Sequence, residues 1–395
     1  MFTTSTSSTH DIPRLRARRG FAMALALGAI VVIGLLIAGV QFTTNQQVVA
    51  GRSSAIQEQA FRLAESGLNT SLANWNSGTV RDSTVTAGKP TTILTKSALT
   101  LPANTLVDSV NVTATRLNPV LYQVTSTAHV GSGPRNSSTR SVSQLVRLLT
   151  AQINILGALT VVGETKIGGS SLINGNDQSP AGWTCDATQP AKAGIAISNA
   201  NLISTSGCNN MNCISGSPKI LETAEASNPD TFFKFGDTSW DQLVAMATLT
   251  MTTNPSPAPV VIGTTCNRTV NTNWGDVGRW IPTRPCESYY PIIYYPGDAH
   301  LTGGTGQGIL LVGGDLSVQG GFKFFGPVII RGRLQTAGTG GHFNGAVMAA
   351  NVDLAENSVL GNAVVNYSSC AVASALKNLP APPIPVRHRA WTEAF

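Results

Sequence analysis

The chain has 395 residues, a formal net charge of +6 and only 12% charged residues, and it is rich in Gly and poor in His. This composition favours a β-rich extracellular protein over a cytosolic enzyme, and the length indicates two or three domains. Residues 1–20 contain four Arg and one Asp, which account for +3 of the charge, so the weakly basic remainder gives little support for nucleic-acid binding.

An uncharged apolar run extends from Phe21 to Val40. As a helix these residues span roughly 30 Å, the thickness of the hydrocarbon core of a bilayer. Arginines crowd the N-terminal side of the run, which predicts a cytoplasmic N-terminus and an outward-facing C-terminal mass: Arg14, Arg16, Arg18 and Arg19. The run is longer than the apolar region of a cleaved secretory signal, so the simplest interpretation is a single membrane anchor.

The helical pattern continues beyond the apolar run. Residues 41–76 contain no proline, and their larger apolar residues recur at helical spacing: Ile56, Ala60, Leu63, Gly67 or Leu68, Leu72 and Trp75. Glu58 and Arg62 support the exposed face, and Gly78 suits a left-handed C-terminal stop. The pattern predicts one helix, about 80 Å long, that is apolar all round in its first half and amphipathic in its second.

Two features taken together resemble a known family over about residues 17–76. They are the junction Arg18-Arg19-Gly20-Phe21 before the apolar run and the segment Gln59–Leu68, which reads QAFRLAESGL. This combination resembles the N-terminal region of the PilX-type minor pilins of type IV pili. The resemblance implies that residues 1–20 are a leader peptide that prepilin peptidase removes after Gly20, and that the new N-terminus, Phe21, is methylated. It also implies that the transmembrane and amphipathic helix, residues 21–76, moves from the membrane into a filament core.

One position departs from the pattern of the major pilins. Those proteins carry a glutamate at the fifth mature position, where it offsets the N-terminal amine of a neighbouring subunit, whereas this chain has Leu25 there. The PilX-type and tip pseudopilin families resembled here often lack this glutamate too. The resemblance therefore implies a priming or tip subunit whose partners are other pilin subunits, the pilus assembly machinery, prepilin peptidase and the membrane. A type II secretion pseudopilus is the alternative assembly.

Residues 77–150 are predicted to form a small antiparallel β domain. Residues 107–115, 120–130 and 139–149 alternate apolar and polar side chains, and turn signals separate them at residues 117–119 and 131–136. A long helix whose amphipathic half lies on such a sheet is the arrangement that pilins use. The expected fold is therefore α+β in this part of the chain and all-β beyond it.

Residues 151–378 carry a different pattern, a repeat of short apolar segments. Four such segments begin at nearly equal intervals, at Gly308, Gly326, Gly345 and Asn362, with Gly or Asn at their corners. Such a period is typical of a β-solenoid, in which each rung buries its apolar side against its neighbours. Residues 300–368 give about three and a half rungs, and residues 157–175 are predicted to form one more.

Residues 176–298 interrupt the repeat and are predicted to be an insertion held by disulfides. They contain five of the six cysteines and four of the six tryptophans, and residues 239–247 suit a short capped helix. Because long loops on a rigid scaffold often carry function, this insertion is a candidate binding surface. Residues 370–376 are predicted to be a short helix that closes the solenoid end, and residues 379–395 a Pro-rich tail.

All the cysteines lie beyond the apolar run: Cys185, Cys208, Cys213, Cys266, Cys286 and Cys370. In an oxidising compartment this even number predicts disulfides, although six cysteines allow fifteen connectivities. Proximity in the sequence favours Cys266 with Cys286 and Cys208 with Cys213, which leaves Cys185 with Cys370. A zinc site is the competing interpretation, and the lack of a C-x-x-C pair and of a nearby His disfavours it.

No other pattern is expected to be catalytic or to hold a cofactor or metal. The glycine-rich segment 303–308 lacks the Gly-Lys-Ser/Thr ending of a phosphate loop, and the five histidines are scattered. Asn174, Asn176 and Asp177 form an incomplete calcium pattern. Carboxylates at Asp315, Asp353 and Glu356 have no spacing that brings them together. Aromatic residues in and beside the insertion suit a buried core better than a sugar- or protein-binding surface: Trp183, Trp274, Trp280, Tyr289, Tyr290, Tyr294 and Tyr295.

These observations predict a non-enzymatic structural protein, a type IV pilus minor pilin or pilus assembly factor that displays an extracellular β-rich module at a filament tip. The first alternative is a membrane-anchored surface adhesin whose insertion binds a surface glycan, a protein or DNA. The second is a membrane-tethered carbohydrate-active enzyme, which would need an acidic cluster on one solenoid face.

Overall fold

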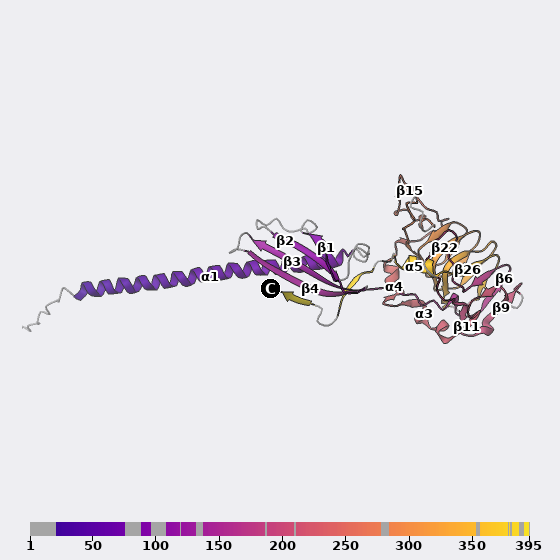
Figure 1. The fold of residues 1–395 in the computed structure, drawn as a ribbon, viewed down its shortest axis with the longest axis horizontal. Helices are drawn as coiled ribbons and strands as arrows, with labels where there is room; N and C mark the ends of the chain where they lie inside the picture. The colour runs from indigo at the N-terminus through magenta and orange to yellow at the C-terminus, as the bar shows by residue number, and fades with distance from the viewer. Residues whose placement is uncertain are drawn as a thin grey trace, which may run out of the picture.

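The molecule is elongated, with a long helix at one end, an antiparallel sheet in the middle and a larger β-rich part at the other end (Figure 1). The computed structural model describes residues 21–75, 88–95, 108–118, 120–131, 137–185, 188–208, 211–277, 284–352, 356–377, 379, 381–386 and 391–394. We call residues 56–75 with the antiparallel sheet the sheet body, and residues 153–379 the distal module.

Helix α1 (Phe21–Ala73) is continuous over 53 residues, which confirms the predicted single helix. Its C-terminal half buries the expected stripe, including Ala60, Leu63, Ala64 and Leu68, against the sheet. Gly67 lies so close to the sheet that a Cβ there would come within 2.8 Å of Val110 and Ser126 side-chain atoms. The sequence needs a glycine at this crossing because the helix backbone itself packs on the sheet. The predicted stop at Gly78 lies outside the described residues.

The antiparallel sheet contains β1 (Pro90–Thr95), β2 (Asp108–Arg116), β3 (Leu121–Gly131) and β4 (Ser137–Leu148), in that spatial order. Three of these strands match the predicted ranges to within two residues, so this prediction is confirmed. Along β3, Tyr122, Val124, Ala128 and Val130 are buried against α1, while the alternate residues face outward. Outward hydroxyls pair across the strands, as between Thr125 and Ser143 at 2.7 Å.

The predicted Pro-rich tail is wrong as a description of residues 379–395, because two segments of it extend the sheet. Strands β27 (Pro383–Pro385) and β28 (Trp391–Ala394) both pair antiparallel with β4. Leu149 donates to the Pro382 carbonyl and Val386 donates to the Leu145 carbonyl. Since these bonds alternate along the pair, Pro383 and Pro385 stand where an N–H would point away from β4, a position that proline tolerates on an edge strand.

The distal module is built from short strands that pair in parallel in three rows. The first row, in spatial order, is β11 (Ile220–Glu222), β8 (Ala193–Ile197), β5 (Gly157–Val161), β24 (His342–Ala349), β22 (Lys323–Ile330), β20 (Ile309–Val312), β17 (Ile292–Tyr295) and β14 (Leu249–Thr250). The second row is β9 (Ile203–Ser206), β6 (Thr165–Gly168), β25 (Asn357–Val359), β23 (Leu334–Thr336), β21 (Leu316–Val318) and β18 (Ala299–Leu301). The third is β10 (Ile214–Ser215), β7 (Leu172–Asn174), β26 (Val364–Tyr367), the first halves of β24 and β22, and β19 (Thr305–Gln307).

The strand pairing follows the period seen in the sequence. Ile292 pairs with Ile309, Leu310 with Val328 and Gly326 with Gly345, so each strand pairs with the strand one repeat further along the chain. The predicted limits of the insertion are wrong at both ends, because β8 to β11 and β17 continue the rows. The short apolar runs of β8 and β17 are buried on both faces and carry no alternation that would mark them as strands.

The glycines of the repeat stand where the chain turns from the third row into the first. Gly308, Gly326 and Gly345 have φ values of 116°, 134° and 154°. A Cβ on any of them would collide with a backbone carbonyl of the neighbouring strand. Only glycine fits such a corner, which explains why the repeated segments begin with it.

The first row carries a core on each of its faces. One face packs inside the module with side chains from all three rows. The other is covered by α4 (Trp240–Ala245), residues Phe232 and Phe235, and part of α5 (Ser369–Lys377). Short elements complete this covering layer and the loops around it: η2 (Ala200–Leu202), η4 (Ala224–Ser227), α3 (Pro229–Phe233), β12 (Lys234–Phe235), β13 (Thr238–Ser239), β15 (Val261–Ile262) and β16 (Thr265–Cys266). The predicted capped helix at 239–247 is confirmed, with a capping box between Ser239 and Gln242.

The order of strands in space differs from their order in the chain. The first strands of the module lie beside the last: Leu159 pairs with Val347, Lys166 with Ser358 and Ile173 with Val365. We call this junction the seam. Both connections to the sheet body leave from it, residues 149–156 before β5 and the chain after α5. The predicted helix at residues 370–376 exists, but its predicted position at the solenoid end is wrong. It packs across β22 and β24 beside the seam.

Candidate functional site: an exposed apolar helix

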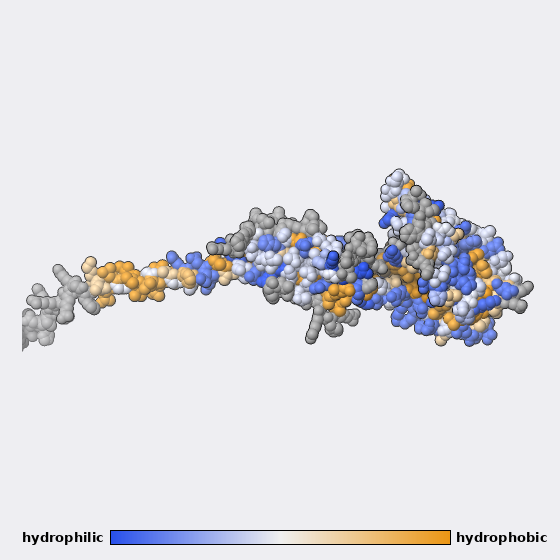
Figure 2. Space-filling model, in the orientation of Figure 1, coloured by the Kyte–Doolittle hydropathy of each residue, from blue (hydrophilic) through white to orange (hydrophobic). Residues whose placement is uncertain are grey.

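The N-terminal half of α1 projects from the sheet body without any packing partner in the described chain. Every described side chain from Met23 to Ala55 is exposed, among them large aliphatic ones such as Leu35 at 68%. By length and composition this helix is able to cross a membrane. Figure 2 shows the projecting half as a continuous apolar surface, separated from the sheet body by a hydrophilic segment.

Charged side chains are absent from α1 before Arg52. The sequence has no Asp, Glu, Lys or Arg between Phe21 and Gly51, and the first turn has no acidic residue. Leu25, in the first turns of this helix, is 60% exposed. Any surface that covers this segment must therefore be apolar, because nothing on the helix offsets a buried charge.

The apolar run ends at a local feature that the sequence pattern did not reveal. The hydroxyls of Thr43 and Thr44 both donate to the Val40 carbonyl, at 2.9 and 2.8 Å. Their polar groups are thus satisfied inside the helix, as threonines in membrane helices commonly are. Beyond them α1 reaches the sheet body, where Arg140 donates to the Gln57 side chain at 2.8 Å and Arg62 pairs with Glu58 at 2.8 Å.

The predicted processing site lies at the start of this helix. Phe21 is the first residue of α1, and Gly20 lies outside the described residues. Cleavage after Gly20 and methylation of Phe21 stay predictions.

The aromatic residues of the predicted insertion form core rather than surface. Trp274 is fully buried and its ring meets those of Tyr295, Phe322 and Phe324 edge to face, at 6.4, 6.1 and 6.4 Å. Trp183, Tyr289 and Tyr295 are also buried, and burial raises the pKa of both tyrosines. The core interpretation is confirmed for these residues, while Trp280 lies outside the described chain.

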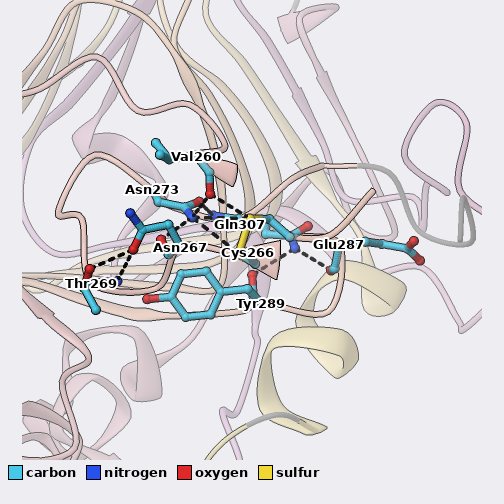
Figure 3. The surroundings of a disulfide bond; sticks show 10 residues. Val260, Cys266, Asn267, Thr269, Asn273, Glu287, Tyr289 and Gln307 are labelled. Carbon is cyan, nitrogen blue, oxygen red and sulfur yellow. Dashed lines mark hydrogen bonds between the residues drawn. A yellow bond between two sulfur atoms is a disulfide. The ribbon is translucent and has the colours of Figure 1, made fainter. Parts of the chain in front are cut away.

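A buried amide organises the loop around one disulfide (Figure 3). The Asn273 side chain donates to the carbonyls of Val260, at 3.1 Å, and Asn267, at 2.7 Å. Buried Gln307 donates to the carbonyls of Glu287 and Tyr289, at 2.8 and 3.0 Å. Sequence reasoning missed both residues, because a lone Asn or Gln carries no pattern that distinguishes it from a surface residue.

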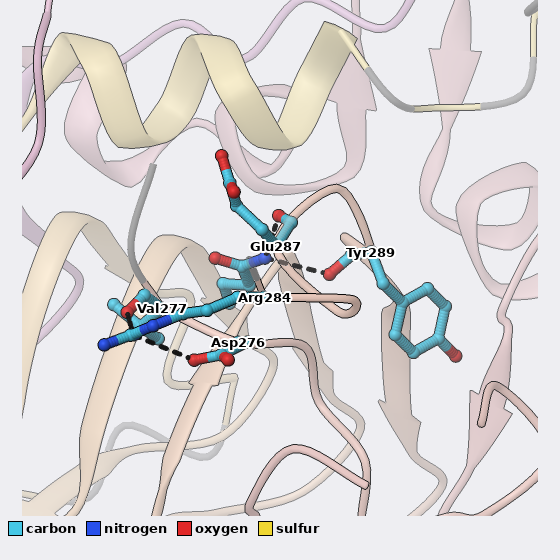
Figure 4. Close-up of polar contacts among 6 residues, drawn as sticks. Asp276, Val277, Arg284, Glu287 and Tyr289 are labelled. Atoms are coloured by element: carbon cyan, nitrogen blue, oxygen red, sulfur yellow. Dashed lines mark hydrogen bonds and ion pairs between the residues drawn. The ribbon is translucent and has the colours of Figure 1, made fainter. Parts of the chain in front are cut away.

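An arginine closes the neighbouring loop (Figure 4). Arg284 contacts the Asp276 carboxylate at 3.2 Å and donates to the Val277 carbonyl at 3.0 Å. The Glu287 backbone N–H donates to the Arg284 carbonyl at 3.2 Å. These contacts join the chain on the two sides of residues 278–283, which lie outside the described residues.

Two of the carboxylates considered for metal binding or catalysis, Asp315 and Asp177, have structural partners. Asp315 accepts from the Arg333 backbone and side chain, at 3.0 and 2.7 Å. Asp177 accepts from Gln189 and from the backbone and hydroxyl of Ser369. Glu356 is exposed and Asp353 lies outside the described chain. Among the described residues, no group of three or more His, Cys, Asp and Glu side chains is placed to hold a metal ion.

The cysteines form three disulfides, Cys185–Cys370, Cys208–Cys213 and Cys266–Cys286. Sequence proximity favoured the second and third of these pairs, and the first is the pair that this choice leaves. Cys185–Cys370 joins residues 185 positions apart, and Cys208–Cys213 closes a loop whose Met211 and Cys213 pack on the end of the module's core.

No family model matches the chain, and no curated protein matches it. Among solved structures it is similar to the crystal structure of the competence-associated pilin ComZ from Thermus thermophilus, at 12% identity over 86% of this chain and 97% of that chain. The TM-score is 0.28, which is too low to support an inference about fold or function. The functional assignment therefore depends on the residues described above.

Proposed function

We propose that this protein is a type IV pilus minor pilin or pilus assembly factor, anchored by α1 and carrying the distal module outside the membrane. One observation carries the proposal: a single helix exposes an uncharged apolar half and buries its other half on an antiparallel sheet. The junction at Gly20 and Phe21 and the segment Gln59–Leu68 support the same assignment through their resemblance to PilX-type minor pilins.

The exposed half of α1 needs an apolar partner. Full burial of one Leu, Ile or Val side chain stabilises by about 1.5–3 kcal/mol, and this segment exposes more than ten such residues. Lipid tails and apolar helices of other subunits are equally able to cover it, because neither offers water to compete. A helix of this kind therefore suits a subunit that waits in a bilayer and then enters a filament, with its N-terminus on the cytoplasmic side.

The distal module is proposed to be a β-solenoid that serves display and assembly rather than catalysis. Its three rows of parallel strands stack with the period seen in the sequence and enclose one core. Of the carboxylates considered for catalysis, Asp315 is engaged by Arg333 at a corner of the module. The buried tryptophans give no support to a glycan-binding surface.

A position at a filament end, in few copies, follows from two features. A repeating subunit must offset each buried N-terminal amine with a carboxylate, and Leu25 supplies none. The distal module would also crowd side-by-side packing along a filament. A subunit at the filament end contacts neighbours on one side only. Both the unpaired amine and the crowding by the distal module therefore matter less there.

N-terminal sequencing and intact-mass measurement test the assignment. In cells with prepilin peptidase the mature protein is expected to begin at methylated Phe21, and in cells without it at Met1. Gly20→Val should block cleavage, whereas Gly28→Ala is a matched control because Gly28 has open space around it. A protein that still begins at Met1 in peptidase-competent cells would leave only a plain membrane anchor.

Immunogold labelling tests the position in the filament. An epitope placed in the exposed turn at Gly263, which has no neighbour within 4 Å, should be accessible without disturbing the core. Gold at the ends of sheared pili is the expected result. Continuous decoration along the filaments would refute the tip position, and gold confined to membranes would refute filament entry.

A further inference from the structure

A short segment after β7 reaches across the seam and grips the start of α5. This segment, residues 177–185, is called the clasp. Gln178 donates to the Tyr367 carbonyl at 2.9 Å. The Asp177 carboxylate accepts from the Ser369 backbone at 2.8 Å and from the Ser369 hydroxyl at 2.7 Å. Cys185 then forms the disulfide with Cys370. The clasp therefore joins the first and last strands of the module outside their backbone pairing.

The clasp sets the position of α5. Trp183 stacks on Phe325 with ring centroids 5.6 Å apart, and both pack with Cys370 and Ala371. Further along the helix Ala375 is buried on the outer face of the first row, as is Leu379 beyond its end. A helix of nine residues has little stability of its own, so α5 depends on these contacts.

The position of α5 in turn sets the last strands of the sheet body. Only five residues separate Lys377 at the end of α5 from Pro383 at the start of β27. Ala381, within this link, is already part of the core of the sheet body. Strand β27 has three residues, two of them proline, and β28 has four, so few backbone bonds retain them on β4. Displacement of α5 is therefore expected to pull the strands off.

We propose that the clasp is a redox-controlled latch that decides whether strands β27 and β28 stay on the edge of β4. With Cys185–Cys370 formed, α5 is fixed and delivers β27 and β28 to β4. A dithiol reductant breaks the S–S bond, transfers two electrons and two protons to give two cysteine thiols, and becomes a cyclic disulfide itself. The released α5 and the strands beyond it then leave together, and the edge of β4 is free to pair with another strand.

Hydrogen exchange measured by mass spectrometry on the full chain in detergent micelles tests the latch. The variant Cys185→Ser/Cys370→Ser is expected to raise exchange at least about tenfold in peptides covering 381–394 and β4, while peptides from α1 and β2 stay unchanged. The matched control, Cys208→Ser/Cys213→Ser, removes a local disulfide at the far end of the module and should leave 381–394 unchanged. Unchanged exchange at 381–394 in the first variant, or an equal rise in the control, would overturn the proposal.

A second measurement covers the case in which the variant fails to fold. Folded wild-type protein is treated with dithiothreitol, and thiols are alkylated and located by mass at each time point. Exchange of residues 381–394 should rise in step with alkylation of Cys185 and Cys370. A rise that instead follows alkylation of Cys266 and Cys286, or no rise once Cys185 and Cys370 are modified, would refute the latch.

Discussion

The sheet body and the distal module are both β-rich, but they are held together by opposite kinds of contact. In the sheet body β2, β3 and β4 pair with their neighbours in the chain, and α1 packs on them without a disulfide. In the distal module the strands of the three rows pair in parallel, the first strands meet the last at the seam, and three disulfides join the loops. Because most contacts in the sheet body join neighbouring segments of the chain, its elements can be predicted from the sequence. The distal module forms only when long loops close.

The largest expected effect is Gly326→Ala in the distal module. Gly326 has φ 134°, and an added Cβ would collide with the Gly308 carbonyl, so the module should lose more than about 3 kcal/mol. Hydrogen exchange read separately in β20 and β3 should show the loss in β20 alone. Gly297→Ala, with open space around it, is the control and should change neither. An equal loss in both strands would show that the two regions unfold as one unit.

The corresponding substitution that should destabilise the sheet body alone is Leu68→Ala in α1. Leu68 is 2% exposed in the core of the sheet body, and its truncation should cost about 2–5 kcal/mol there. Exchange in β3 should accelerate while exchange in β20 does not. Leu35→Ala removes the same side chain from the exposed half of the helix and should leave both strands unaffected. Acceleration by Leu35→Ala would mean that this half packs on the body.

A smaller expected effect is a loss of stability of the distal module at alkaline pH, which the sheet body should not share. Burial raises the pKa of Tyr295, Tyr289 and Tyr367 above the usual value of 10.0, with Arg268 opposing the shift at Tyr289 and Asp177 adding to it at Tyr367. Below pH 10 these phenols are protonated in both the folded and the unfolded state. Above it the unfolded state releases protons that the folded state keeps, so stability falls as pH rises toward the raised folded values.

The measurement for this effect is the exchange in β20 and β3 between pH 8 and 11, corrected for the intrinsic exchange rate. All three tyrosines lie in the distal module, so β20 should lose protection as pH rises. Tyr295→Phe should flatten that dependence. If β20 loses protection with rising pH equally in the variant and the wild type, a group other than Tyr295 controls that loss.

The smallest expected effect concerns the neck between the regions. Arg147 on β4 and Asp237 in the turn between β12 and β13 form an ion pair at 2.6 Å, and both side chains are partly exposed. A double-mutant cycle with Arg147→Gln and Asp237→Asn should give a coupling of at most about 1 kcal/mol that weakens with added salt. A coupling above about 2 kcal/mol would indicate that this contact joins the regions more firmly than its exposure allows.

The sequence by itself determined α1, the three central strands of the sheet and the repeat period. Each of these depends on neighbours in the chain or on a fixed spacing. The apolar stripe at Ala60, Leu63 and Leu68 has the period of a helix, and Tyr122, Val124 and Val130 have the period of a strand, so one buried face is enough to reveal them.

Only the tertiary structure decided the seam, the return of β27 and β28 to β4 and the roles of Asn273 and Gln307. The seam pairs strands from opposite ends of the module's sequence, such as Leu159 with Val347, and no local period records which rung will meet which. The proline-rich strand suits β4 only because an edge leaves one side of the strand unbonded. The buried amides matter because the folded loop brings backbone carbonyls to them, and an isolated Asn or Gln in a sequence gives no sign of the acceptors it will find.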